Sequence, residues 1–290
     1  MSNYLARLFY LGDRYYGSQY QPGFNTVQGN LIEAIERWSG DTHSPQTVQI
    51  SGRTDRGVHS IGQLVMVAAN KQLDVDRINK YLPEDIQLWA STKAPDGFKS
   101  RHSVLMRHYR YFLVDYWKDI DSTLVKRAIS LLIGSNDFAH LSKPDSGRST
   151  MTTILNISFQ QLNNVCFLDF FGTRFLWKQV RKIVTLFTDI GIGKIQLDKV
   201  ENMLNAQISL PSGIRPAPPE NLVLVETVVP VKLKTSKYAI HRIMAHLNDK
   251  LDFYKRSTST INSIINFFPS ELGMTYRRST KQQSPSALLD

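Results

Sequence analysis

The stretch SGRTDRGVHS, residues 51–60, places a carboxylate among small and basic side chains. Asp55 lies between Arg53 and Arg56, and a glycine flanks this group on each side. Glycines in these positions predict a tight turn that brings the backbone close to another part of the molecule. Two arginines beside one aspartate favour its charged form, and such a carboxylate can act as a nucleophile or a general base. A turn-capping aspartate with solvated arginines is the alternative, and these residues alone favour it.

Apolar patterns on both sides of this stretch predict a mixture of strands and helices. Branched and aromatic runs predict strands at 4–11, 61–69, 86–93, 106–117, 152–159, 165–171 and 222–229. Apolar positions at helical spacing predict helices at 27–38, after an N-cap at Thr26, and at 74–82, 122–133, 175–190 and 239–253. Asn163 and Asn164 separate two of the strands and predict a hairpin. Because strands and helices do not alternate strictly, we expect an α+β fold with a largely antiparallel sheet.

Length and charge indicate a globular protein with an anionic partner. A chain of 290 residues corresponds to about two domains. Lys and Arg total 35 against 25 Asp and Glu, a net charge of +10. This excess favours a polyanion such as nucleic acid, although a basic enzyme without such a partner fits the charge equally well.

Other patterns exclude several classes of protein. The single cysteine, Cys166, excludes an intramolecular disulfide and a multi-cysteine zinc site. The GIGK stretch at 191–194 lacks the first glycine and the Ser/Thr of a phosphate loop. No apolar run approaches the ~20 residues that span a bilayer, and the first residues turn polar too early for a signal peptide. We therefore expect a cytoplasmic protein outside the membrane.

The 51–60 stretch resembles the GRTDAGVHA signature of the TruA family of tRNA pseudouridine synthases. It departs from that signature at Arg56, where alanine is usual, and at Ser60, where another small residue is usual. Four further blocks resemble the family in the same order, at 15–31, 98–113, 175–184 and 217–225. The GSQ at 17–19, where bacterial members often carry GWQ, is more similar to archaeal members. The resemblance covers residues 4–230.

The resemblance implies roles for individual residues. It makes Asp55 the catalytic nucleophile, Arg181 its ion-pair partner and Tyr109 the ring that stacks on the target uracil. Taken alone, Tyr109 on its strand favours a core position, and Arg181 on the flank of its helix favours a surface position. The resemblance also implies residues that bind the RNA. Arg53 would fill the gap left in the RNA when the target base rotates out of its stack, and phosphate contacts are expected from Arg56, Lys99, Arg101 and Arg107. Leu224 would also contact the substrate, although core packing is equally consistent with its position.

The resemblance also implies an architecture and a substrate. It implies two α+β subdomains, 1–103 and 104–232, whose mainly antiparallel sheets join across a central basic cleft with helices on the outer faces. It implies a homodimer that acts on uridines 38 to 40 of the tRNA anticodon stem-loop, without a metal or an organic cofactor. A pseudouridine synthase with another RNA target and a non-catalytic RNA-binding protein of the same fold are the alternatives.

Residues 233–290 lie outside the resemblance. They carry nine Lys and Arg against four Asp and Glu, half of the chain's excess charge. One interpretation is an added RNA contact, with Arg277 and Arg278 as candidates. The other is a helical appendage that packs on the body or supports the dimer.

Overall fold

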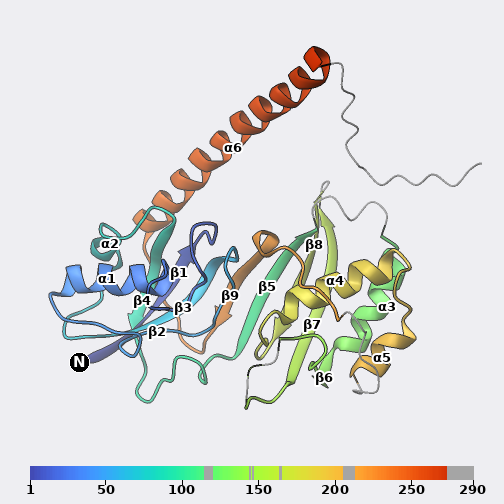
Figure 1. Ribbon diagram of the computed structural model, residues 1–290. Coiled ribbons are helices and arrows are strands. Elements are labelled where there is room, and N and C mark those ends of the chain that lie inside the picture. Colours follow the sequence, from blue (N-terminus) through green and yellow to red (C-terminus); the bar gives the residue numbers. More distant parts are fainter. Residues whose placement is uncertain (114–119, 144, 146, 163–164, 205–212, 273–290) are drawn as a thin grey trace, which may run out of the picture. The chain divides into compact units, whose positions relative to one another are not determined.

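Ten strands form one sheet in the part of the chain that the structure describes (Figure 1). The computed structural model describes residues 1–113, 120–143, 145, 147–162, 165–204 and 213–272, with only the helical backbone for 268–272. The strands are β1 (Ser2–Tyr10), β2 (Val48–Ile50), β3 (His59–Ala69), β4 (Ile86–Lys93), β5 (Met106–Leu113), β6 (Gly134–Asp137), β7 (Met151–Leu162), β8 (Val165–Gly172), β9 (Leu222–Val228) and β10 (Lys234–Thr235). Their order is β10-β4-β1-β3-β9-β5-β8-β7-β6, and β2 pairs with β3.

One parallel pair joins the two halves of this sheet. β3 and β9 run parallel, with His59 opposite Val223 and Ser60 opposite Leu224. The other pairs of described strands are antiparallel. The α+β class and the largely antiparallel sheet are therefore confirmed. Because β3 begins directly after residues 51–58, this loop lies at the centre of the sheet.

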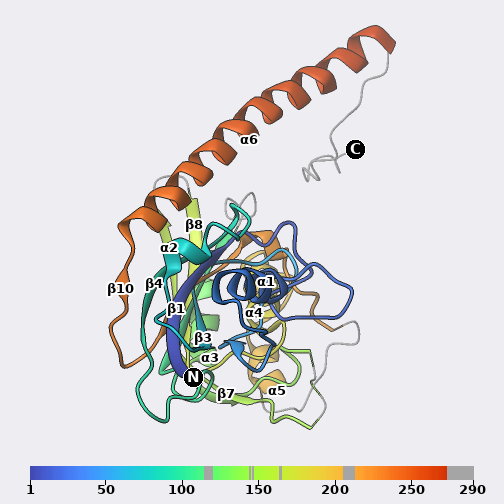
Figure 2. The same cartoon turned by 90° about the vertical axis from the view of Figure 1, so that its left-hand side faces the viewer.

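Two groups of helices cover the two halves of the sheet. The helices are α1 (Val27–Ser39), α2 (Val75–Ile78), α3 (Ser122–Leu132), α4 (Gln179–Gly191), α5 (Asp198–Leu204) and α6 (Lys237–Leu272), with a 3-10 turn, η2 (Pro219–Asn221). One apolar core joins α1 to β1–β4 within residues 6–88. A second core joins α3 and α4 to β5, β7 and β8 within residues 109–224, and it also includes Val58. Figure 2 shows α1 and α4 on the same side of the sheet.

Local side-chain contacts explain where several helices begin and end. Thr26 caps α1 as predicted, because its hydroxyl accepts a hydrogen bond from Gly29 N at 3.2 Å. The helix predicted at 74–82 is shorter, since the Asn79 side chain bonds both the N–H and the C=O of Leu88 and ends α2. The helix predicted from 175 begins only at Gln179, because Lys178 adopts a left-handed conformation with φ 63°.

The chain divides into two units, Met1–Ile243 and the part that starts at Met244. α6 begins in the first unit and extends beyond the predicted 239–253 helix at both ends. The Asn163-Asn164 turn, the predicted strand beyond residue 113, and Arg277 and Arg278 lie outside the described residues. Across the described ranges, no helix has the length and apolarity needed to cross a membrane.

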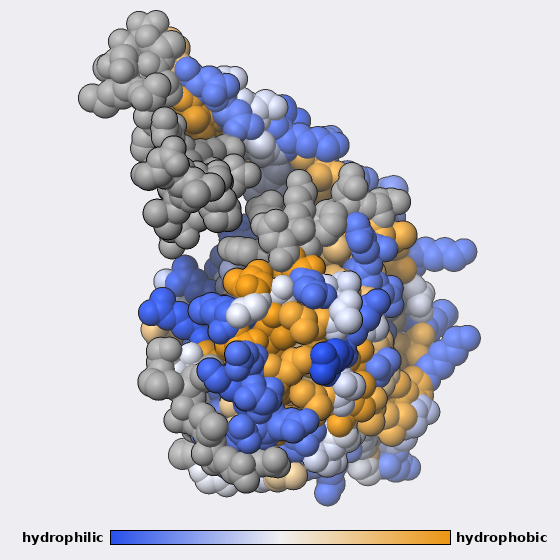
Figure 3. Space-filling view, turned by 90° about the vertical axis from the view of Figure 1, so that its right-hand side faces the viewer, coloured by the Kyte–Doolittle hydropathy of each residue, from blue (hydrophilic) through white to orange (hydrophobic). Residues whose placement is uncertain are grey.

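The end of the sheet that carries β6 and β7 exposes apolar side chains. Figure 3 looks at this end and shows hydrophobic residues gathered between hydrophilic margins. Ile133, before β6, and Leu155, in β7, are among the exposed large hydrophobic residues of the chain. Apolar atoms contribute more than half of the accessible surface of an ordinary folded protein.

Candidate active site

The loop between β2 and β3 is anchored by hydrogen bonds on both sides of Asp55. Thr54 N donates to Ser18 Oγ at 2.8 Å, and the Thr54 hydroxyl bonds the buried Tyr10 hydroxyl at 2.8 Å. Val58 N closes a turn on the carbonyl of Asp55 at 3.2 Å. These bonds fix the backbone that carries the carboxylate.

The predicted glycine turn is present at Gly57. Its φ is +85°, a conformation that residues with a Cβ rarely adopt, and a Cβ there would lie 2.9 Å from Cγ of Pro219. Gly52 differs, because a Cβ at that position would meet no atom closer than Arg107 Nε at 3.5 Å. The predicted close approach of backbone to a neighbouring segment is therefore confirmed at Gly57, whereas the contacts at Gly52 are of ordinary van der Waals length.

Both oxygens of the Asp55 carboxylate accept a hydrogen bond. Arg181 Nη1 donates to Oδ2 at 2.5 Å, and the indole Nε1 of Trp177 donates to Oδ1 at 2.9 Å. The Asp55 side chain is 20% exposed, so it remains accessible from solvent. The two donors orient the carboxylate and counter its charge.

Arg181 is held from behind by the chain that leads into β9. Its Nε donates to the carbonyl of Ala217 at 2.6 Å, and Ala217 N donates to the carbonyl of Arg181 at 3.0 Å. The residue is only 9% exposed although it lies in the first turn of α4. The alternative of a surface arginine on the helix flank is therefore wrong, and the guanidinium is positioned before any substrate arrives.

Tyr109 lies on β5 with its ring packed edge-on against Phe175, at 5.3 Å between ring centroids. It is 6% exposed, and burial raises the pKa of its hydroxyl above the ordinary range. The hydroxyl is therefore uncharged at neutral pH.

Asp55, Arg181 and Tyr109 line one cavity of about 1020 Å³. Its described lining includes nine Lys and Arg residues but only two carboxylates, Asp55 and Asp145. The nine are Arg53, Arg56, Arg101, Arg107, Lys143, Arg148, Arg174, Lys178 and Arg181. Such a lining attracts anions.

Two predicted binding residues do not line this cavity. Leu224 is fully buried in the core between β3 and β5, and Leu222 lines the cavity instead. The side chain of Leu224 packs in the apolar core with residues of α3 and α4, so its predicted substrate contact is wrong. Lys99 is exposed and lines a second, adjacent cavity.

Arg107 is committed to the protein backbone. It is 8% exposed, and its two terminal nitrogens donate to the carbonyls of Thr173 at 2.7 Å and Ser51 at 3.0 Å. This geometry joins the loop before Asp55 to the segment before α4. It favours a positioning role over the predicted phosphate contact. Arg53, Arg56 and Arg101 are exposed at the cavity, where phosphate can reach them.

Comparison with known proteins identifies the family. A family model described as tRNA pseudouridine synthase matches residues 6–97 and 128–228. The chain belongs to this family. The similar proteins include tRNA pseudouridine synthase A of Methanothermobacter thermautotrophicus, 33% identical over 88% of this chain and 92% of that protein. Another is tRNA pseudouridine synthase A of Methanosarcina acetivorans, 37% identical over 76% of this chain and 81% of that protein.

The predicted family and enzyme class, an isomerase that forms pseudouridine, are confirmed by these matches. Among solved structures, a chain of a Cbf5-Nop10-Gar1 complex overlaps 64% of this chain, and 54% of that chain is covered. The TM-score is 0.33 at 8% identity, too weak a likeness to inform the site.

Trp177 lines the cavity and bonds Asp55, and the sequence did not reveal this contact. It lies inside the block 175–184, but its indole is as consistent with packing as with hydrogen bonding. One sequence feature could have indicated its contact with Asp55: Trp177 lies four residues before Arg181, in the segment that turns before α4. Within the described part of the chain, no group of three or more His, Cys, Asp or Glu residues could hold a metal ion.

Proposed function

We propose that this chain converts uridine to pseudouridine in tRNA, with Asp55 as the catalytic carboxylate. The observation that carries this proposal is the Asp55 carboxylate, bonded to Arg181 and Trp177 in a cavity lined by cations. A nucleic acid backbone supplies the anion that such a lining attracts. The family membership and the relatives named tRNA pseudouridine synthase A support the reaction.

The reaction breaks the C1′–N1 bond of uridine and forms a C1′–C5 bond. A proton leaves C5 and N1 gains one, so the conversion balances without a co-reactant. The uracil must leave its stack and enter a pocket before it can rotate. Asp55 acts there by attack on C1′, by attack on C6 or as a base, and each of these routes requires an ionised carboxylate.

Other residues of the cavity bind the flipped nucleotide. Tyr109 stacks on the uracil, and Arg53 fills the space that the base leaves in the RNA. Arg56 and Arg101 contact phosphates. Stacking contributes about 1–3 kcal/mol per base, which offsets part of the cost of unstacking. The uridines to test first are 38 to 40 of the anticodon stem-loop, which the TruA resemblance implies, and the compartment is the cytoplasm, where that substrate is found.

We also propose that two copies of the chain assemble through α6. Side chains at alternating spacings of three and four residues form a seam along this helix: Met244, Leu247, Leu251, Tyr254, Thr258, Ile261 and Ile265. This 3.5-residue period is the pattern that two supercoiled helices bury between them. Met244, Leu251, Tyr254 and Ile261 are each more than half exposed. A second copy supplies an identical seam, which supports the homodimer and favours the structural interpretation of the extension.

The carboxylate of Asp55 provides the direct test of the reaction. Asp55→Asn keeps the size and shape of the side chain but removes its nucleophilicity. Pseudouridine formation in tRNA is measured by chemical mapping of the modified base. We expect it to fall to a few per cent of the wild-type level or less. Affinity for tRNA should stay within a few-fold, because the phosphate contacts are unchanged.

Asp145→Asn is the matched control, since Asp145 is the other described carboxylate of the cavity. It removes the same charge and should retain most of the activity. Comparable turnover in Asp55→Asn and Asp145→Asn would overturn the assignment. A wild-type protein that binds tRNA without modifying it would instead favour the non-catalytic alternative.

A further inference from the structure

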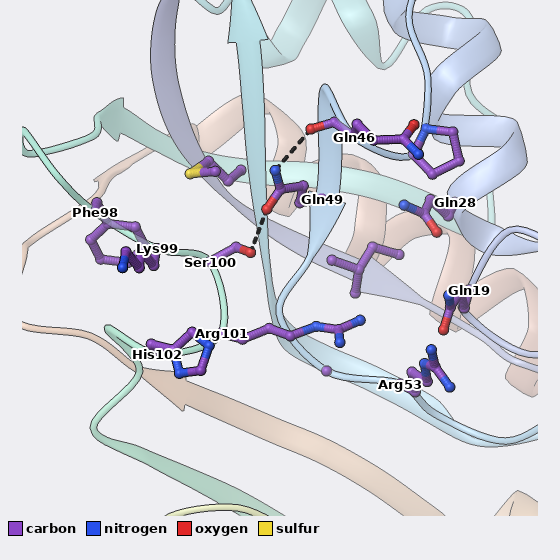
Figure 4. Close-up of a pocket in the computed structure, with 14 residues that line it drawn as sticks. Gln19, Gln28, Gln46, Gln49, Arg53, Phe98, Lys99, Ser100, Arg101 and His102 are labelled. Atoms are coloured by element: carbon purple, nitrogen blue, oxygen red, sulfur yellow. Dashed lines mark hydrogen bonds between the residues drawn. The ribbon is translucent and has the colours of Figure 1, made fainter. Parts of the chain in front are cut away.

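A second cavity of about 510 Å³ opens beside the Asp55 cavity (Figure 4). The two cavities share part of their lining, including Gln19, Arg53, Arg101 and His102. The second cavity contains neither Asp55 nor Tyr109 in its lining. It therefore adjoins the reaction site without being part of it.

The second cavity has an apolar floor. Ile50 and Met66 are largely buried side chains of the sheet, and Phe98 is half-buried beside them. An apolar surface of this kind accommodates the face of a flat ring system.

Polar amides surround this floor, and two of them are already in use. Gln28 donates to the carbonyl of Val48 at 2.7 Å and accepts from Tyr20 N at 2.8 Å. Gln49 accepts from the Ser100 hydroxyl at 2.7 Å and donates to the carbonyl of Gln46 at 2.8 Å, as the dashed lines in Figure 4 mark. These bonds hold the walls of the cavity in place before a ligand binds.

Two other amides are available to a ligand. The side chains of Gln19 and Gln46 make no hydrogen bond with any described residue, although both line the cavity. A primary amide offers both donors and an acceptor, which matches the edge of a nucleobase.

Two guanidinium groups stand on the wall between the cavities. Figure 4 shows Arg101 reaching across the cavity toward Arg53. Neither forms an ion pair or a hydrogen bond with a described residue. Burial, and then the positive charges of Arg53 and Arg148, lower the pKa of Arg101. Uncompensated like charges held this close favour an anion between them.

We propose that the second cavity binds a further nucleotide of the RNA substrate, adjacent in the strand to the target uridine. Its base lies on the apolar floor and is read by Gln19 and Gln46, and the phosphate that links the two nucleotides crosses the shared wall at Arg101. The identity of the polymer rests on the proposed function. The arrangement makes the enzyme read the base beside the target as well as the target itself.

The test combines changes in the protein with changes in the RNA. Three stem-loop RNAs are used: the intact RNA, one that lacks the base on the 5′ side of the target, and one that lacks the base on the 3′ side. The affinity of each RNA is measured for wild type and for Gln46→Ala. Gln46 is exposed and its side chain makes no bond with a described residue, so its truncation leaves the fold intact. We expect one abasic position to weaken wild-type binding about ten-fold. Gln46→Ala should weaken binding to the intact RNA a few-fold and leave binding to that abasic RNA unchanged.

Gln161→Ala provides the matched control, because Gln161 is an exposed glutamine on β7 far along the sheet from this cavity. It should bind all the RNAs as wild type does. The second nucleotide site would be overturned if Gln46→Ala weakened binding to both abasic RNAs as much as it weakens binding to the intact RNA. Pseudouridine formation by wild type is measured in the same samples, so that failure of the proposed function is seen separately as a loss of turnover on the intact RNA.

Discussion

Asp55 receives one hydrogen bond from the guanidinium of Arg181 and one from the indole of Trp177. Removal of the one donor should disturb the fold more than removal of the other. Arg181 carries the opposite charge and is buried against the backbone. Trp177 is 47% exposed and contributes an oriented N–H without charge. The indole is therefore the contact that can be removed with the least disturbance of the fold.

We predict that Trp177→Phe lowers kcat for pseudouridine formation about ten-fold. A hydrogen bond to a charged group contributes about 1.5–3 kcal/mol, and its loss leaves Asp55 Oδ1 without this donor while Arg181 still holds Oδ2. Thermal unfolding should change little. Trp89→Phe is the control, because Trp89 Nε1 bonds the carbonyl of Ile61 and does not line the Asp55 cavity. Equal kcat values for the two variants would show that the indole does not position Asp55.

Tyr109 is expected to contribute its ring to stacking on the uracil and its hydroxyl to the later loss of the proton from C5. Tyr109→Phe keeps the ring against Phe175 and should leave the Kd for tRNA unchanged while turnover slows about ten-fold. Tyr109→Leu should also raise the Kd about ten-fold, because stacking on the base is lost. Single-turnover rates and filter binding separate the two effects. If the phenylalanine variant turns over as fast as wild type, the hydroxyl has no role and stacking alone remains.

At the scale of the elements, a cluster of polar side chains around the buried Asp169 joins β5 to β8. Asp169 Oδ1 lies 2.7 Å from His108 Nε2 and 2.8 Å from Arg110 Nε, and Arg110 Nη2 lies 2.9 Å from Asp169 Oδ2. Burial opposes the charge of Asp169, but the hydrogen bonds from Arg110 and His108 prevail and hold its pKa below the ordinary value. The side chain is 4% exposed, so the cluster supports the strand that carries Tyr109.

We predict that Asp169→Asn lowers the free energy of unfolding by about 3 kcal/mol, because it leaves a guanidinium without its partner. The lowered pKa means that the cluster stabilises the fold above the pKa of the unfolded aspartate and that this contribution is lost as the pH falls through the folded value. Denaturant unfolding at several pH values should therefore show a smaller acid loss in the variant than in wild type.

Asp252→Asn is the control, since Asp252 forms an exposed pair with Lys255 on α6. Such pairs contribute about 0–1 kcal/mol, so little change is expected. An Asp169→Asn protein as stable as wild type at neutral pH would rule out a structural role for the cluster.

At the scale of the whole molecule, the seam of α6 predicts self-association. The pair of changes Leu251→Lys and Ile261→Lys places charges inside the seam, and we expect it to convert a dimer into a monomer in analytical ultracentrifugation. Ser259→Lys, outside the seam on the same helix, should remain dimeric. A wild-type chain that sediments as a monomer, or a dimer that survives both seam substitutions, would contradict assembly through α6.

Short-range patterns were sufficient for much of the fold. The N-cap at Thr26 and the strands at 106–113 and 222–228 follow from side chains within one turn or one strand, where steric and hydrogen-bonding preferences act locally. The resemblance of the 51–60 stretch likewise indicated the family to which the chain belongs. Helix ends at Asn79 and Gln179 escaped prediction, because contacts with Leu88 and the turn at Lys178 determine them.

Contacts between distant segments decided the site. Arg181 lies 126 residues from Asp55, and its burial and its bond to Ala217 depend on α4 packing against the chain before β9. Leu224 packs in the core with residues of α3 and α4 rather than in the cavity, and the parallel pairing of β3 with β9 joins the two halves of the sheet directly after the Asp55 loop. Burial and long-range pairing arise only when the whole chain packs, so residue type and spacing could not assign Trp177, Arg107 or Leu224 correctly.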